Sequence, residues 1–121
     1  MKISYETRTL VDYSFKLGYL FSVTVSDLKK IITLIKKEDF NSVSNIIEKD
    51  FVIRFDSIEK YFYKLFTHDG INEDEINDIK NFCEHARILI KDCINEIKNS
   101  NSLTKEKIDL IEKLLIDLLD N

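Results

Sequence analysis

Two cysteines and two histidines are the side chains in this sequence best suited to nucleophilic, redox or metal chemistry. Cys83 and Cys93 lie in one stretch with helical periodicity, ten residues apart, which separates them by about 15 Å along the axis. A disulfide needs Cα atoms within about 7 Å, so the two cannot pair inside that helix. Both lie on its apolar stripe, where a thiol acts as a small hydrophobic group. We therefore predict buried, unreactive cysteines. The one indication of a reactive thiol is Arg87, one turn after Cys83, because a neighbouring positive charge is typical of reactive thiols.

The other candidates for catalysis or metal binding lack the required spacing. Cys83 and His85 face different sides of a helix, and His68 is expected at a helix end. The acidic segment 72–78 lacks the glycine and the alternating ligands of a calcium loop, and the helix dipole alone favours acidic residues in a first turn. The sequence contains neither a Gly-x-Ser-x-Gly elbow nor a glycine-rich phosphate loop. We therefore predict a protein that is not an enzyme and has no catalytic, cofactor-binding or metal-binding residues.

The helix that carries both cysteines is predicted over residues 71–97. Asn72 is expected to cap it, with Glu75 completing a capping box, and Ile71 and Ile76 have the spacing of a hydrophobic staple. An apolar residue recurs at every third or fourth position, which gives one stripe on a 3.6-residue period. The stripe consists of Ile76, Ile79, Phe82, Cys83, Ala86, Ile90, Cys93 and Ile97. Other helices must cover it.

Composition favours helices through the whole chain. The 121 residues include no proline and two glycines, so little in the sequence forces a break or a turn. An apolar content of 44% is sufficient for a packed core, and the length suits one domain, 1–121. We predict an all-α fold: a single-domain antiparallel bundle of four to five helices.

The remaining helices follow from the same periodicity. A first helix is predicted over 5–37. The β-branched residues within 21–25 lower helix propensity and would allow a break near 24–27, but the apolar stripe passes through them without losing phase, so a continuous helix is favoured. Asp39 is expected to cap a short second helix, and a third covers about 50–69, either continuing from the second or starting afresh. Gly70 suits the end of that helix. A polar loop at 99–102 precedes a last helix capped by Thr104, with Leu103 and Ile108 as a second staple.

Several apolar residues fall outside the main stripes. Phe15, Tyr19 and Val23 follow one another at steps of four on the side of the first helix opposite its main stripe. Two arrangements would give this pattern: a central helix packed on two sides, or a helix with one face that binds a partner. We slightly favour the central helix. On the third helix the corresponding residues are Val52, Ile53, Tyr61 and Tyr63. Aromatic residues in such positions favour protein contacts.

Charge and hydropathy restrict the classes of partner. A net charge of −4 and a pI near 5.2 do not favour nucleic-acid binding. The longest uncharged run, 17–26, is too short to span a membrane, and charged residues interrupt any secretory leader near the start. We therefore predict a cytoplasmic protein. Heavy use of Ile, Lys and Asn indicates an AT-rich genome, which suggests a bacterium or phage.

One segment resembles a known family in its residue types. Residues 34–40, followed by Ile46, Ile47 and Arg54, form a helix, a charged turn and a second helix carrying an arginine. This arrangement is similar to the small helical chaperones of flagellar export, over about a fifth of the chain. The resemblance implies a helical chaperone that binds another protein.

The leading hypothesis is a non-enzymatic module that binds another protein, such as a small bacterial or phage inhibitor, immunity protein or antitoxin. Its expected contact residues are Phe15, Tyr19, Val23, Val52, Tyr61 and Tyr63. The alternatives are a homodimeric structural or regulatory bundle that pairs through its first helix, and an export-type chaperone.

Overall fold

The protein is a bundle of helices. The computed structural model describes residues 5–68 and 73–119, with side chains for 8–49, 51–65 and 73–119. This part of the chain has no strand, and it forms five α-helices and one π-helical turn. The elements are α1 (Tyr5–Lys36), α2 (Phe40–Ile46), η1 (Ile47–Phe51), α3 (Val52–His68), α4 (Glu73–Ser100) and α5 (Lys105–Leu119). The predicted all-α fold is confirmed.

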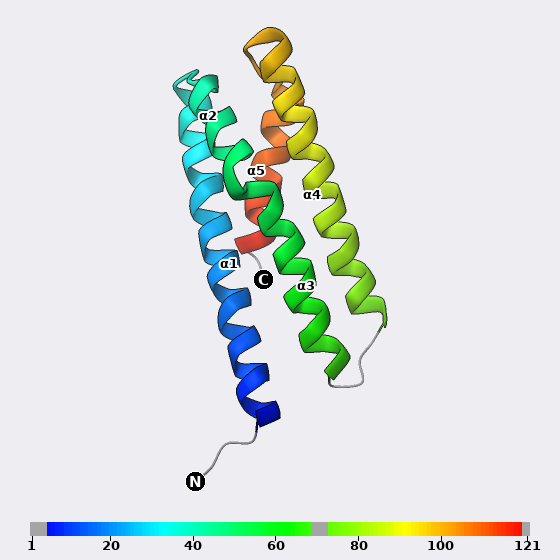
Figure 1. Ribbon diagram of the computed structural model, residues 1–121. Helices are drawn as coiled ribbons and strands as arrows, with labels where there is room; N and C mark the ends of the chain where they lie inside the picture. The colour runs from blue at the N-terminus through cyan, green and yellow to red at the C-terminus, as the bar shows by residue number, and fades with distance from the viewer. Residues whose placement is uncertain (1–4, 69–72, 120–121) are drawn as a thin grey trace.

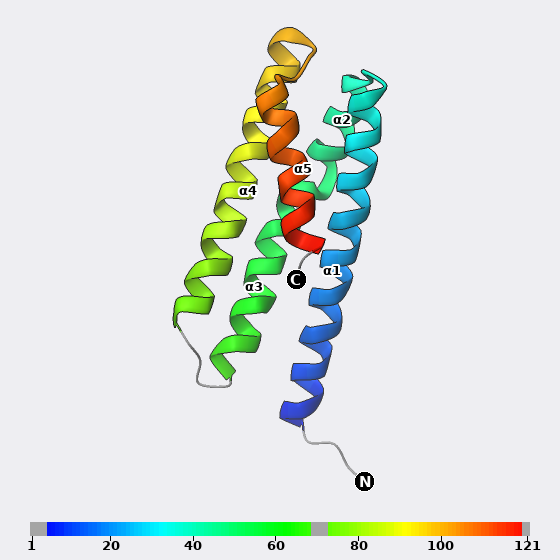
Figure 2. The same ribbon diagram turned by 180° about the vertical axis from the view of Figure 1, so that it is seen from behind.

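The long helices run up and down in turn. The chain ascends through α1, returns through α2, η1 and α3, ascends again through α4 and descends through α5 (Figure 1). α1 packs against both α3 and α5, α3 packs against α4, and α4 packs against α5. The view from behind shows that α5 covers only one half of the length of α1 and α4 (Figure 2). The predicted antiparallel bundle is therefore built from four helical segments, α1, α2–η1–α3, α4 and α5, and α5 is the shortest of them.

α1 is continuous through 24–27, as the unbroken phase of its apolar stripe predicts. Thr24 is completely buried, and its Oγ1 donates a hydrogen bond to the Leu20 carbonyl 2.7 Å away. Leu28 and Ile31 continue the same stripe into the core. Packing of an apolar stripe against other helices contributes more than the low helix propensity of a few β-branched residues.

The turn after α1 contains the predicted N-cap of α2. Asp39 accepts a hydrogen bond from the Ser42 backbone N–H at 3.3 Å and caps α2 as expected. Glu38 has a φ of 59°, a left-handed conformation that lets the chain reverse after the last turn of α1. The chain then enters α2 without a glycine.

A π-helical turn joins α2 to α3, so the third predicted helix continues from the second. Val43, Ile47, Phe51 and Phe55 are fully buried and follow one another at steps of four. On a regular α-helix such residues drift around the axis, because four residues exceed one turn of 3.6. The wider turn of η1 takes up this drift and keeps all four in the core.

The last loop also follows its prediction. The Lys107 backbone N–H donates to the Thr104 hydroxyl at 3.4 Å, which confirms Thr104 as the cap of α5. Leu103 is buried, and Ile108 is partly buried against the core. Leu118 is buried at the end of α5, whereas the next residue, Leu119, is 55% exposed. The predicted features at His68, Gly70, Ile71 and Asn72 lie outside the described side chains.

One ion pair fixes how α1 lies against α3. The Arg54 guanidinium on α3 donates a hydrogen bond to the Asp27 carboxylate on α1, and the two side chains are only 13% and 18% exposed. A charge removed from water needs its partner, because the lost hydration must be replaced. The pair therefore favours one register between the two helices.

We expect Asp27→Ala to lower the free energy of unfolding by about 3 kcal/mol, because Arg54 would stay buried without its partner. Urea denaturation measures this loss. Adding Arg54→Leu should recover much of it, because the unpaired charge is then removed as well. Glu48→Ala, which breaks an exposed pair with Lys98, is the control and should change stability by less than about 1 kcal/mol. Equal effects of Asp27→Ala and Glu48→Ala would contradict this role.

Candidate functional site

The two cysteines are part of the hydrophobic core. Cys83 and Cys93 are free thiols with no exposed surface, on the side of α4 that faces the bundle. Burial raises the pKa of each thiol from 9.0 to about 12. At neutral pH both thiols are protonated and act as small hydrophobic groups. The predicted burial is therefore confirmed.

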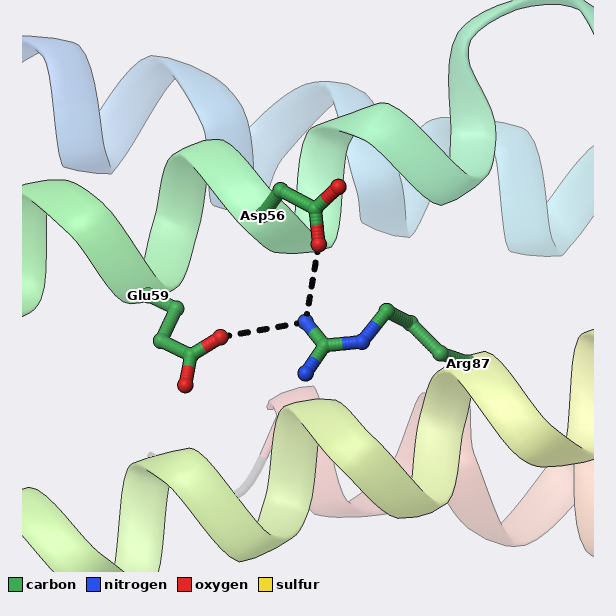
Figure 3. Close-up of polar contacts among 3 residues, drawn as sticks. All are labelled: Asp56, Glu59 and Arg87. Atoms are coloured by element: carbon green, nitrogen blue, oxygen red, sulfur yellow. Dashed lines mark hydrogen bonds and ion pairs between the residues drawn. The ribbon is translucent and has the colours of Figure 1, made fainter.

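Arg87, which suggested a reactive thiol, points toward α3 instead. Its Nη1 donates to the Asp56 carboxylate at 3.0 Å and to the Glu59 carboxylate at 3.1 Å (Figure 3). Arg87 lowers the pKa of Cys83 only slightly against the larger effect of burial. The arginine therefore joins α3 to α4 and occupies both acidic side chains of α3.

The histidine and acidic candidates do not form a metal site in the described part of the chain. His85 is exposed, the His68 side chain lies outside the described residues, and Glu73, Asp74 and Glu75 form the first turn of α4. No group of three or more His, Cys, Asp or Glu side chains within residues 8–49, 51–65 and 73–119 has the geometry to hold a metal ion.

The second apolar stripe of α1 faces outward. Phe15 is 74% exposed and Tyr19 is 70% exposed, while Val23 is partly buried. The favoured expectation, a central helix packed on two sides, is therefore wrong for this part of α1. The physical reason is that α1 turns its main stripe, which includes Leu17, Thr24 and Leu28, toward the rest of the bundle.

Phe15 and Tyr19 border a groove between α1 and α3. The groove is lined by Phe15, Lys16, Tyr19 and Leu20 of α1 and by Ser57 and Tyr61 of α3. We call this surface the α1/α3 face. Of the predicted contact residues, Phe15, Tyr19 and Tyr61 thus come together, and Val23 follows Tyr19 one turn further along α1.

The remaining predicted contact residues lie elsewhere on α3. Tyr63 is 55% exposed and lines a different groove, between α3 and α4, together with Ile76 and Ile79. Val52 is about three turns before Tyr63, which places it on the same side of α3, and it packs partly buried against the core. Ile53, at 62% exposure, is an outward-facing residue near the other end of α3.

Lysines surround the tyrosines of the α1/α3 face, a feature that sequence reasoning missed. Tyr13 and Tyr61 pack together with ring centroids 5.7 Å apart. The ammonium groups of Lys16, Lys60 and Lys64 lie 5.5–5.8 Å from the centre of the Tyr61 ring, and Lys64 is also 5.2 Å from that of Tyr13. These distances are typical of cation–π contacts. The spacing of Tyr13 and Lys16 on one helix, and of Tyr61 and Lys64 on another, was the available signal.

The electrostatic environment keeps Lys16 charged. Its ammonium group is 3.1 Å from the exposed Asp12 carboxylate. The hydrogen bond and the charge of Asp12, with a smaller effect of Tyr61, raise the pKa of Lys16 above its ordinary value. Lys16 is therefore a cation throughout the physiological pH range.

The charges of the molecule are distributed unevenly among the helices. α1 contains five basic and three acidic residues, and α3 contains three basic and two acidic residues. α4 and α5 together contain seven basic and eleven acidic residues. The net negative charge of the protein therefore comes mainly from α4 and α5, whereas the two helices of the α1/α3 face are each net basic.

A second groove lies between α4 and α5. It has an apolar floor that includes Phe82, Leu89 and Leu114, and charged residues at its edges. Ile88 and Leu110, which also line it, are 52% and 39% exposed. An ion pair between Lys107 and Asp92, 3.6 Å long, connects the two helices here. This groove is aliphatic and lacks the aromatic and cationic character of the α1/α3 face.

Comparisons of the chain with known protein families, with curated proteins and with solved structures found no match. None of the described helices combines the length and apolar character needed to cross a membrane.

We expect both thiols to react with a thiol reagent only after unfolding. At pH 8 a pKa of about 12 leaves about 1000-fold less thiolate than the ordinary value of 9.0, and burial blocks access as well. Reaction with Ellman's reagent in buffer and in guanidinium chloride measures the difference. Rapid modification of one thiol in the native protein would contradict the burial described.

The same pKa shift predicts a pH dependence of stability. The unfolded thiols lose protons near pH 9 and the native thiols near pH 12, so the native state holds more protons between these values and stability falls as pH rises. We expect the loss between pH 9 and 12 to be smaller in Cys83→Ala/Cys93→Ala than in wild type. An identical loss in urea denaturation would show that the native thiols titrate normally.

Proposed function

We propose that this protein is a non-enzymatic module that binds and occludes another protein through its α1/α3 face, as a small bacterial or phage inhibitor, immunity protein or antitoxin does. The observation that carries the proposal is the exposure of Phe15 and Tyr19, one turn apart, beside a groove that also exposes part of Tyr61. Large aromatic side chains at the surface bury much apolar area when a partner covers them. We place this function in the cytoplasm.

The arrangement supports binding better than internal packing. Phe15 and Tyr19 contribute almost nothing to the core, because about three quarters of each side chain faces solvent. They follow the i, i+4 spacing that makes one ridge of a helix, and Val23 extends the ridge by another turn. A ridge of this kind beside a groove has the shape that helical partners recognise.

Electrostatics weigh against the alternative of a homodimer through α1. A two-fold pairing of two α1/α3 faces would set the surface that holds Lys16, Lys60 and Lys64 against the equally lysine-rich surface of the other copy. Like charges brought together across an interface repel. A foreign partner avoids this cost, so we retain it as the proposal.

We expect the wild-type protein, used as bait in a lysate of its native host, to retain a partner that Phe15→Asp/Tyr19→Asp does not retain. The two aspartates add buried charge at the expected centre of the interface, so the purified partner should bind the variant at least tenfold more weakly. Ile88→Asp/Ile116→Asp is the matched control, because these residues are 52% and 54% exposed on α4 and α5. Circular dichroism confirms that each variant is folded.

Two results would contradict the proposal. Equal retention by the Phe15→Asp/Tyr19→Asp variant would place the contact elsewhere on the molecule. Concentration-dependent sedimentation of wild type as a dimer, lost in the same variant without any retained partner, would favour the homodimer. Occlusion requires in addition that the purified partner lose its own activity when the wild-type protein is added.

A further inference from the structure

We infer that the α1/α3 face recognises an amphipathic helix whose apolar stripe is flanked by acidic residues. The inference rests on the proposed function and specifies the partner's chemistry. It follows from the shape of the groove, the placement of its lysines and the way in which the acidic side chains of α1 and α3 are used elsewhere.

The shape of the groove suits a helix. α1 and α3 are antiparallel neighbours (Figure 1). Each presents a ridge of residues at steps of four beside the groove. On α1 the ridge contains Phe15, Tyr19 and Val23, and on α3 it contains Ser57 and Tyr61. Leu20 contributes an apolar residue to the lining between them. A third helix laid along this groove can insert its own apolar side chains between the two ridges.

The acidic side chains of α1 and α3 are largely engaged away from this groove. Asp27 pairs with Arg54 between the two helices, and both side chains are mostly buried. Asp56 and Glu59 bind Arg87 on the side of α3 that faces α4 (Figure 3). Lys16, which pairs with Asp12, is the lysine that lines this groove. Lys60 and Lys64 lie at its edge beside Tyr61 and also line the α3/α4 groove, where the carboxylates of Asp56 and Glu59 are bound to Arg87.

The lysines are placed to meet acidic side chains at the edges of such a helix. Lys16 lines the groove from α1, and Lys60 and Lys64 rise from α3 beside Tyr61. Their ammonium groups lie within 5.8 Å of the centre of the Tyr61 ring. A partner helix with apolar residues at its centre and Glu or Asp at its flanks satisfies both parts of this surface.

The same contacts favour a protein partner over a nucleic acid. Single-stranded nucleic acids bind proteins by stacking bases on open aromatic rings. Here the Tyr61 ring is surrounded by lysine ammonium groups and packs against Tyr13, whose ring also has Lys64 close by.

Two synthetic peptides test this inference directly. Each has about 18 residues, or about five helical turns, with the same leucine stripe and one tryptophan, and the flanking positions are Glu in one and Lys in the other. The protein contains no tryptophan, so the fluorescence of the peptide reports binding alone. We expect the acidic peptide to bind at least tenfold more tightly than the basic one at low salt, and the difference to shrink as salt is added.

Charge reversal on the protein separates the inferred chemistry from general stickiness. Lys16→Glu/Lys60→Glu should weaken binding of the acidic peptide by about tenfold and strengthen binding of the basic one. Lys91→Glu/Lys105→Glu alters two exposed lysines of α4 and α5 and should leave both affinities unchanged. Phe15→Ala/Tyr19→Ala should weaken binding of the acidic peptide without changing its salt dependence.

The outcomes distinguish failure of this inference from failure of the proposed function. The inferred chemistry is wrong if the acidic peptide does not bind, if the basic peptide binds equally well, or if only a single-stranded oligonucleotide binds in a lysine-dependent way. The proposed function survives such a result when a host protein is still retained through Phe15 and Tyr19. It fails separately, whatever the peptides do, when that retention does not depend on these two residues.

Discussion

The ion pair between Asp27 and Arg54 is the interaction on which the arrangement of the candidate surface depends. Its buried charges favour one register of α1 against α3, and that register brings Lys16 to Tyr61 and Tyr13 to Lys64. A slip of the two helices by one turn would separate these residues and open the lysine cluster. A contact between the helices thus determines which side chains meet on their outer side.

The side chains best suited to chemistry all serve structure in this fold. Cys83 and Cys93 fill the core, where burial keeps them protonated, and Arg87 joins α3 to α4 through two carboxylates. The engagement of Asp56 and Glu59 by Arg87 has a second effect, because it directs negative charge toward α4. The net basic character of α1 and α3 and the net acidic character of α4 and α5 come from the residues that each helix contains.

The π-helical turn at Ile47–Phe51 shows how the backbone adapts to the core. Residues at steps of four cannot remain on one side of a regular α-helix over several turns. The wider turn keeps Val43 through Phe55 buried and lets α2 and α3 act as one descending arm of the bundle. It also sets the rotation of α3 about its axis, and so the direction in which Ser57 and Tyr61 face.

The sequence by itself determined the helices, their main apolar stripes and the caps at Asp39 and Thr104, because helical periodicity and capping depend on residues close together in the chain. It also determined the burial of Cys83 and Cys93, which lie at the centre of one stripe. At 24–27 the phase of the apolar stripe was a better guide than local propensity, because burial of Thr24 keeps α1 continuous.

The tertiary structure decided what the second stripe of α1 does. Phe15 and Tyr19 are exposed because α1 turns its main stripe toward the bundle, and Tyr63 lies apart from them because α3 turns it toward α4. Lys16 of α1 meets Lys60 and Lys64 of α3 around Tyr61, and these residues are more than 40 positions apart in the chain. The periodicity of a single helix does not predict such contacts.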